Sequence, residues 1–277
     1  MGLRINTNVQ SLAAQRNLSQ SNRMQQGSLE KLASGTRIVR SADDAAGLAI
    51  AEKMKASIRS IRQDTRNAND GISMIQTAEG GLSEIGNILV RFRELSIQAA
   101  SDTIGDTERG FIDKEVSQLK SEIDRIALST EFNGRKLLNG DGDKIEVQIG
   151  QGNRADTDRF EFDLASTNAS ADRLGVKDLT VAEKESAQAN LDVIDSALQT
   201  LSSSRANLGA MQNRLQSAVN HLGVYEENLS SARSRIYDVD MASESAELAK
   251  NSILTQSGTS VLSQANQNPM MALKLMG

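Results

Sequence analysis

Two seven-residue hydrophobic repeats constrain this 277-residue chain more than any other feature of its sequence. In the second half, aliphatic residues recur at every seventh position and a further apolar residue often follows three positions later, as at positions a and d of a coiled coil. The a positions are Ile194, Leu201, Leu208, Leu215, Leu222, Leu229 and Ile236. No proline lies between Val181 and Asp238, so we predict one continuous helix there, in which the repeat covers about 65 Å.

A second repeat predicts another long helix over about residues 43–100. Its seam is formed by Ile61, Ala68, Ile75, Leu82 and Leu89, with Ala78, Ile85, Phe92 and Ala99 three positions behind. Ser41 followed by Asp44 is a variant of the capping box, and we predict that it starts this helix. Three glycines, Gly80, Gly81 and Gly86, should weaken the helix by about 1 kcal/mol each relative to alanine.

The pattern changes between the two repeats. Apolar residues at four- and three-residue steps from Ile112 to Ile126 predict a shorter helix, and the Asn133-Gly134 turn is its expected end. Beyond it, two stretches alternate between apolar and polar residues. They predict a β-hairpin with a long loop over about residues 141–175. Its apolar residues are Ile145, Val147, Ile149, Phe160, Phe162 and Leu164.

Both ends of the chain carry weaker heptad patterns in a background rich in Gln, Asn and Ser. Short polar helices are marginal alone, so we expect them to become ordered mainly with partners. Pro269 is expected to interrupt the C-terminal pattern. The apolar positions that define the two patterns include Ile5, Val9 and Leu12 near the N-terminus and Leu254, Val261, Ala265 and Leu275 near the C-terminus.

Composition excludes several classes of function. Aromatic residues make up only 3% of the chain, so its core must be built mainly from aliphatic residues and methionine. Cysteine is absent, so disulfides, thiolate nucleophiles and cysteine-ligated metals are excluded. The 31 Lys and Arg are interleaved with 36 Asp and Glu, for a net charge of −5, which argues against nucleic acid as a partner. No stretch approaches the roughly 20 apolar residues of a membrane span, and the N-terminus lacks the apolar run of a secretory signal.

No catalytic, cofactor or metal site is predicted. His221 is the single histidine, so histidine-based triads and metal clusters are excluded, and we expect its side chain to be solvated. The residues from Asn139 onward resemble the start of a calcium-binding loop, but Lys144 occupies the position at which such a loop requires glycine, so a calcium site is not predicted. Asp43 and Asp44 are adjacent, so they do not face one another on a helix, and capping explains them better than catalysis.

Seven sequence blocks, in order along the chain, resemble those of the bacterial flagellins. In the N-terminal half they are INTNVQSLAAQRNL, LEKLASGTRIVRSADDAAGLAIAEKM, RFRELSIQAASDT and STEFNGRKLLNG. In the C-terminal half they are RANLGAMQNRLQSAVNHL, NLSSARSRIYDVDMASESAELAKNSIL and QSGTSVLSQANQNP. Together they cover nearly all of residues 1–140 and 190–277.

The resemblance implies a mainly α fold in two parts. Residues 1–41 and 238–277 would pair as an inner, terminal coiled-coil domain. Residues 42–237 would form a rod domain of long antiparallel helices with the β-hairpin at about 141–175. Longer flagellins insert outer domains in the middle, and the short connection here implies that this chain lacks them.

The resemblance also implies a structural, non-enzymatic subunit that polymerises into the extracellular flagellar filament for motility and is secreted without a cleaved signal peptide. The implied partners are other copies of the chain in a helical homopolymer, an export chaperone, the flagellar type III export apparatus, and the filament cap and hook-junction proteins. The self-assembly residues would be Ile5, Val9, Leu12, Leu254, Val261, Ala265 and Leu275. Toll-like receptor 5 would recognise Arg91, Leu95 and Glu115, which match the residue types that recognised flagellins use.

Three alternatives remain open from the sequence alone. A hook–filament junction protein shares the terminal patterns. A cytoplasmic coiled-coil adaptor would be a folded dimer with dispensable ends. A carboxylate-dependent hydrolase would need a pair of acidic residues in a pocket, whereas the sequence indicates only solvated carboxylates on helix faces.

Overall fold

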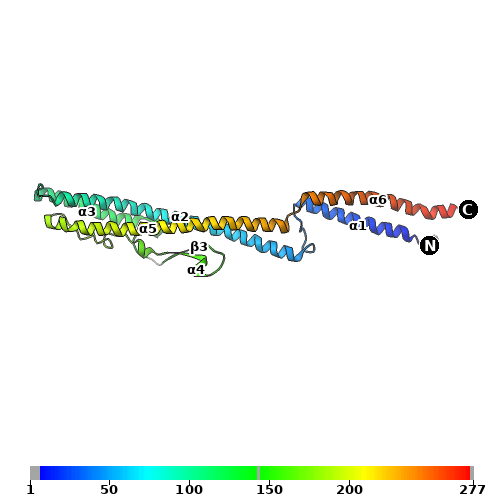
Figure 1. Cartoon of the computed structure of the whole chain (residues 1–277), viewed down its shortest axis with the longest axis horizontal. Helices are drawn as coiled ribbons and strands as arrows, with labels where there is room; N and C mark the ends of the chain where they lie inside the picture. Colours follow the sequence, from blue (N-terminus) through cyan, green and yellow to red (C-terminus); the bar gives the residue numbers. More distant parts are fainter. Residues whose placement is uncertain (1–6, 142–143, 275–277) are drawn as a thin grey trace. The chain divides into compact units, whose positions relative to one another are not determined.

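The computed structural model describes residues 7–141 and 144–274, with side chains up to Gln267. Within these residues the fold is mainly α, as predicted, and most of it is long helix (Figure 1). The helices are α1 (Val9–Ser34), α2 (Ala45–Ala99), α3 (Asp106–Ser129), α4 (Ala155–Asp158), α5 (Lys184–Tyr237) and α6 (Met241–Lys274). The strands are β1 (Glu131–Phe132), β2 (Arg135–Lys136), β3 (Ile145–Gln148) and β4 (Arg159–Phe162), and a 3₁₀ turn, η1, spans Leu164–Thr167.

The chain divides into two compact units. The terminal unit runs to Ile58 and resumes at Glu227, and the central unit spans Arg59–Glu226. The predicted boundaries at residues 41/42 and 237/238 coincide with the connections from α1 to α2 and from α5 to α6. The units themselves divide inside helices α2 and α5, so the predicted division into domains stays a prediction.

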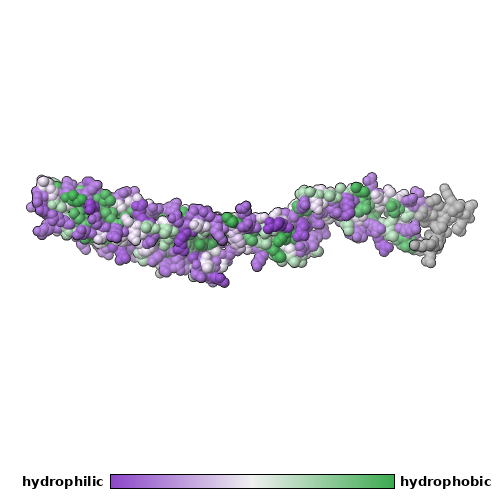
Figure 2. All heavy atoms as spheres, in the orientation of Figure 1, coloured by the Kyte–Doolittle hydropathy of each residue, from purple (hydrophilic) through white to green (hydrophobic). Residues whose placement is uncertain are grey.

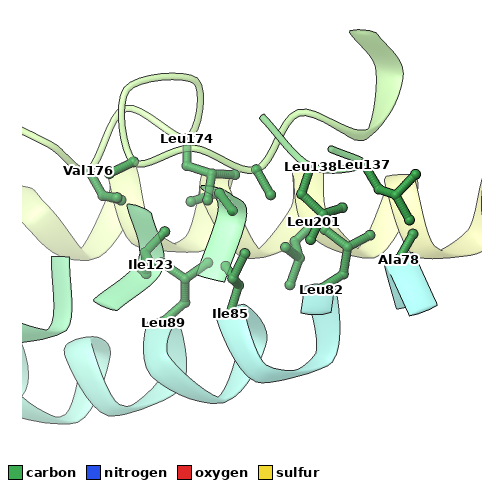
Figure 3. Close-up of a cluster of buried hydrophobic side chains, with 14 of the residues drawn as sticks. Ala78, Leu82, Ile85, Leu89, Ile123, Leu137, Leu138, Leu174, Val176 and Leu201 are labelled. Carbon is green, nitrogen blue, oxygen red and sulfur yellow. The ribbon is translucent and has the colours of Figure 1, made fainter. Parts of the chain in front are cut away.

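Both predicted long helices are present, and their apolar seams form the core of the central unit. Every seam residue of α2 is buried, as are the α5 seam residues from Ile194 to Leu222. The two helices run antiparallel, since Arg93 is paired with Asp195 near one end of the unit and Arg62 with Glu226 near the other. Leu82, Ile85 and Leu89 of α2 face Leu201 of α5 and Ile123 of α3 (Figure 3). This packing removes the apolar stripe of each helix from water, which is the main stabilising contribution.

The start of helix α2 differs from the prediction. Asp44, not Ser41, caps the helix: its Oδ1 accepts the Gly47 N–H at 2.8 Å. The neighbouring Asp43 accepts the Val39 and Arg40 N–H groups at 3.1 and 2.9 Å, and these bonds, the one from Arg40 foremost, lower the pKa of Asp43. The predicted capping box was therefore wrong. The explanation by capping is confirmed for Asp44 alone, because Asp43 accepts N–H groups of the connection before the helix.

The end of helix α3 also differs. The helix stops at Ser129, and Asn133-Gly134 instead connects β1 and β2, which pair through Glu131↔Lys136 and Phe132↔Arg135. Asn133 and Gly134 have φ values of 50° and 78°, as a two-residue hairpin turn requires. The dipeptide forms a turn, as predicted, but the turn belongs to a short hairpin that was not predicted.

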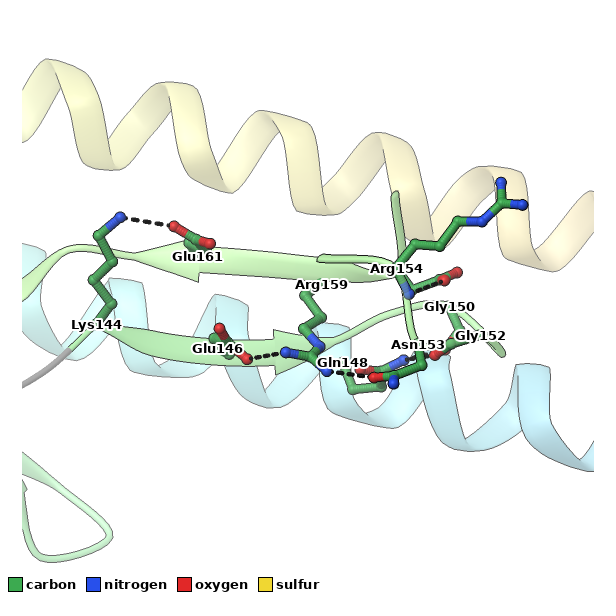
Figure 4. Close-up of polar contacts among 10 residues, drawn as sticks. Lys144, Glu146, Gln148, Gly150, Gly152, Asn153, Arg154, Arg159 and Glu161 are labelled. Carbon is green, nitrogen blue, oxygen red and sulfur yellow. Dashed lines mark hydrogen bonds and ion pairs between the residues drawn. The ribbon is translucent and has the colours of Figure 1, made fainter. Parts of the chain in front are cut away.

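The predicted longer hairpin is present as β3 and β4, but it is shorter than the expected 141–175: Ile149 follows β3, and Leu164 lies in η1. Ile145 lies opposite Phe162 and Val147 opposite Phe160, and Ile145, Phe160 and Phe162 are buried in the central core. On the opposite face, Lys144 is paired with Glu161 and Arg159 with Glu146, at 3.0 and 2.9 Å (Figure 4). The alternation of apolar and charged residues thus matches the two faces of the hairpin.

Two adjacent glycines in α2 lie in opposite surroundings, which gives a matched prediction. A Cβ added at Gly80 would meet nothing within 4 Å, whereas one at Gly81 would lie 2.6 Å from Leu138 Cδ1 and 2.7 Å from Thr130 Oγ1. We expect Gly80→Ala to raise the free energy of unfolding by about 1 kcal/mol. Gly81→Ala should lower it, because the gain in helix propensity is outweighed by overpacking that costs about 1–3 kcal/mol. Urea unfolding followed by circular dichroism measures both, and equal effects would contradict this account.

Candidate assembly and recognition surfaces

Helices α1 and α6 of the terminal unit pack side by side in opposite directions (Figure 1). At one end, Asn8 Nδ2 donates to the Ala265 carbonyl at 2.8 Å and Ser11 Oγ donates to Asn266 Oδ1 at 2.7 Å. At the other end, Thr36 and Asp238 form an isolated antiparallel bridge. The two ends of the sequence are therefore held together along the whole length of α1.

The fully buried residues of the interface between α1 and α6 are small or polar, while four leucines of the pair are half-buried: Leu18, Leu32, Leu248 and Leu262. Its buried residues include Ala14 and Ser28 of α1 and Asn251 and Ala265 of α6. Gly258 allows α1 to approach closely, since an added Cβ there would lie 3.3 Å from Leu18 Cδ1. No large apolar side chain of the described part of this pair is fully buried, so the hydrophobic effect stabilises the pair less than it stabilises the core of the central unit.

Other large apolar side chains of the same pair point to solvent. Val9 and Leu12 are 64% and 52% exposed, and Leu254 and Val261 are 47% and 55% exposed. Met24, Leu29, Met241 and Ile253 are also exposed. Figure 2 shows apolar atoms at the surface over α1 and α6. Together these side chains form what we call the apolar terminal surface, and exposed apolar surface of this kind marks interaction sites.

The structure thus separates the predicted self-assembly residues into three groups. Val9, Leu12, Leu254 and Val261 lie on the apolar terminal surface, and Ala265 is buried between α1 and α6. Ile5 and Leu275 lie outside the described residues. Pro269 does not end the last helix, because α6 continues to Lys274.

The predicted receptor residues are only partly brought together. Arg91 donates to Glu115 Oε1 from Nε at 3.0 Å and from Nη2 at 2.9 Å, and to Glu94 at 3.0 Å. These bonds, the one to Glu115 foremost, raise the pKa of Arg91. Leu95 is 2% exposed and packs in the core. Arg91 and Glu115 therefore present an exposed ion pair joining α2 to α3, while Leu95 is buried in the core.

A buried carboxylate in the central unit was missed from the sequence. Asp64 of α2 is 5% exposed, and among the described residues its Oδ2 has no hydrogen-bond partner. The pKa of Asp64 is raised mainly by its burial, and the nearby Asp158 carboxylate raises it further. The ionised form of Asp64 therefore destabilises the fold. The free energy of unfolding falls as the pH rises from the ordinary pKa of an aspartate through the raised pKa of Asp64. The available signal was its position: Asp64 follows Ile61 by three residues, where the heptad repeat calls for an apolar side chain.

The solvated position predicted for His221 is confirmed, since its side chain is exposed on α5. No group of three or more Asp, Glu or His side chains in the described part of the chain is arranged to hold a metal ion. Within the described residues, no helix is both long and apolar enough to cross a membrane.

Comparison with known families accounts for both halves of the chain. The N-terminal helical region of bacterial flagellin matches residues 5–143, and the C-terminal helical region matches residues 191–276. The flagellin of Halalkalibacterium halodurans is 42% identical over 272 residues, which cover 98% of this chain and 99% of that protein. The flagellin of Bacillus subtilis is 41% identical over 308 aligned positions, covering 99% of this chain and all of that protein.

Solved structures agree with the fold. The crystal structure of Bacillus cereus flagellin superposes with a TM-score of 0.50 at 33% identity, covering 57% of this chain and 88% of that one. A putative flagellar hook-associated protein from Vibrio parahaemolyticus gives a TM-score of 0.58 at 12% identity, covering 71% of this chain and all of that one. The second likeness is one of fold alone. The chain belongs to the bacterial flagellins, the structural, non-enzymatic subunits of the extracellular flagellar filament.

Proposed function

We propose that this flagellin polymerises by coupled folding and assembly of its terminal helices. The observation that carries the proposal is the burial in the α1–α6 pair: its fully buried residues are small or polar, whereas Val9, Leu12, Leu254 and Val261 are exposed. A pair built in this way is marginal by itself. It gains stability when a second copy covers the apolar terminal surface, because burial of a Val or Leu side chain contributes about 1.5–3 kcal/mol.

The proposal extends to Ile5 and Leu275, which continue the predicted apolar patterns at the two ends of the chain. Ala265 contributes differently, because it is already buried between α1 and α6. The terminal helices of one subunit would then meet those of its neighbours and line the inside of the filament. Residues 1–41 and 238–277 would be the segments that become fully ordered only in the polymer.

Seeded growth tests this proposal. Purified monomer is mixed with short filament fragments and observed by electron microscopy, and we expect the fragments to elongate. In parallel, limited proteolysis of the monomer should remove both termini before it cuts the central unit, since marginal terminal helices open most readily. Monomer that resists proteolysis at both ends, or seeds that do not grow, would contradict coupled folding and assembly.

The apolar terminal surface also needs protection before assembly. We propose that an export chaperone covers α6 in the cell, where Ile253, Leu254 and Val261 would otherwise associate prematurely. The type III export apparatus would then deliver the chain without a cleaved signal peptide, and the filament cap and hook-junction proteins would contact the same terminal helices at the filament ends. Loss of chaperone co-purification on deletion of residues 241–277 is the expected result.

A second role, recognition by Toll-like receptor 5, is favoured by the exposed Arg91–Glu115 pair. We expect Arg91→Ala and Glu115→Ala each to raise the monomer concentration needed for half-maximal receptor signalling by roughly tenfold, as loss of a charge-assisted contact does. A receptor reporter assay with purified monomer provides the measurement.

The matched control for that assay is Arg125→Ala. Arg125 forms an exposed pair with Glu122 on α3 at 2.6 Å, and its loss should leave signalling unchanged. Leu95 is buried, so a substitution there would act through the fold and cannot test contact. Full potency of both the Arg91 and the Glu115 variants would exclude this surface as the receptor site.

A further inference from the structure

The buried carboxylate of Asp64 lines a cavity of about 420 Å³ in the central unit. The cavity lies between α2, the loop that joins β3 to β4, and α5. Its lining includes Asp64, Asp158, Ile149, His221, Leu222 and Tyr225. Its size falls within the range of small-molecule sites, which is about 300–1,000 Å³.

The loop that forms one wall is held in place by several polar contacts. Gln148 Nε2 donates to the carbonyls of Gly150 and Gly152 at 2.6 and 2.9 Å, and Arg154 N–H donates to Asp158 Oδ2 at 2.9 Å (Figure 4). Asn67 of α2 donates to the Gln148 carbonyl at 3.0 Å. These contacts hold the loop in a defined position against α2.

The charges around the cavity are unbalanced. Asp64 and Asp158 both line it, and among its described lining residues there is no lysine or arginine. Arg62, two residues before Asp64 on α2, is paired with Glu226 at 2.7 Å. Asp64 Oδ2 is thus a buried acceptor with no donor. Such a group is costly unless a ligand supplies the missing hydrogen bond.

We propose that this cavity binds a primary alkylammonium group, with Asp64 as its main acceptor. An ammonium offers three N–H donors and a positive charge, and these satisfy Asp64 Oδ2 and balance the Asp158 carboxylate. The ring of Tyr225 stands at the cavity wall, where it can contribute a cation–π contact. The alkyl stem of the ligand packs along the apolar wall formed by Ile149, Ala218 and Leu222.

A divalent metal fits this lining less well. Calcium requires six to eight oxygen ligands, and only two carboxylates line the cavity among the described residues. An ammonium needs fewer oxygen ligands and gains from the apolar and aromatic walls. The ammonium has two sources, a free alkylamine or the side chain of a lysine from a second copy of this chain in the filament.

The test is a titration of the full-length monomer with n-butylamine at low salt, followed by heteronuclear NMR of the residues lining the cavity. We expect saturable shifts with butylamine and none with 1-butanol, its neutral counterpart. Asp64→Asn should weaken binding roughly tenfold or more through loss of the charge-assisted bond. Because it keeps the shape of the side chain and removes a buried charge, this variant should fold normally by circular dichroism.

The matched control is Asp70→Asn, which removes the same charge from an exposed position on α2 and should leave binding unchanged. Tyr225→Leu should weaken binding without unfolding the chain. Filaments that no longer bind butylamine would identify the lysine of a neighbouring subunit as the natural source, and filaments that still bind it would identify a free amine. Equal binding by the Asp64 and Asp70 variants, equal shifts with 1-butanol, or saturation by calcium alone would overturn the proposal.

Discussion

Replacing Leu254 and Val261 together with serine should abolish filament formation while leaving the central unit folded. Both side chains are about half exposed on α6 and contribute to the apolar terminal surface. If polymerisation buries the exposed half of each, the double change removes about 1.5–3 kcal/mol of association free energy per subunit. That loss raises the monomer concentration needed for growth by about ten- to a hundredfold. Sedimentation and electron microscopy of seeded monomer measure the effect.

The control for this experiment is Leu128→Ser on α3. Leu128 is 57% exposed, close to the 55% of Val261, but it lies in the central unit and outside the apolar terminal surface. We expect this variant to form filaments normally. Circular dichroism should show the same helix content for all the monomers. Filaments of ordinary length from the Leu254/Val261 double variant would exclude the apolar terminal surface as the assembly interface.

Phe92→Ala should cause the largest loss of stability of any single substitution considered. Phe92 is 0% exposed and belongs to the core cluster of the central unit. Truncation of a buried Phe to Ala costs about 3–5 kcal/mol, because the transfer free energy of the ring is lost and a cavity remains. The midpoint of urea unfolding, followed by circular dichroism, should fall accordingly.

Phe111→Ala makes the same chemical change at a position that is 63% exposed on α3. We expect it to alter the free energy of unfolding by no more than about 0.5 kcal/mol. A comparable loss in both variants would mean that the seam of α2 is not what stabilises the central unit.

The long helices were predictable because their signal is cooperative and repeated. Each a or d residue of the α2 and α5 seams adds to the same period, and tertiary packing follows that period directly. Local signals were less reliable. Ser41 and Asp44 both suit a cap, and only the backbone conformation determines which of them begins the helix. Asn133-Gly134 suits a turn, but the dipeptide does not reveal that two-residue strands flank it.

The candidate surfaces were predicted less completely, because the sequence does not show which face of a weakly patterned helix is covered. Gly258, Ala265, Leu254 and Val261 were all assigned to one seam, yet Ala265 is buried against α1 while Leu254 and Val261 face outward. Small residues such as Ala265 can pack closely between two helices. The hydrophobicity of the residues therefore did not show which face of α6 is covered by α1.

Buried polar residues posed the same problem in the central unit. Arg109 is 8% exposed and donates to the carbonyls of Ala99 and Ser101 at 2.9 and 3.1 Å, which joins the end of α2 to α3. Nothing in its residue type distinguishes it from the solvated arginines nearby. Asp64 did carry a signal, a charged residue at a heptad d position, and such departures from a repeat identify candidate ligand sites.

The antiparallel pairing of α1 with α6 has a consequence for how the chain matures. Asn8 and the Ala265 carbonyl that it bonds are separated by 257 positions in the sequence. Helix α1 therefore cannot find its partner until almost the whole chain has been synthesised. A chain that terminates prematurely carries an unpaired α1 and lacks half of the apolar terminal surface. If polymerisation requires the paired terminal helices, as proposed above, truncated subunits would be excluded from the polymer.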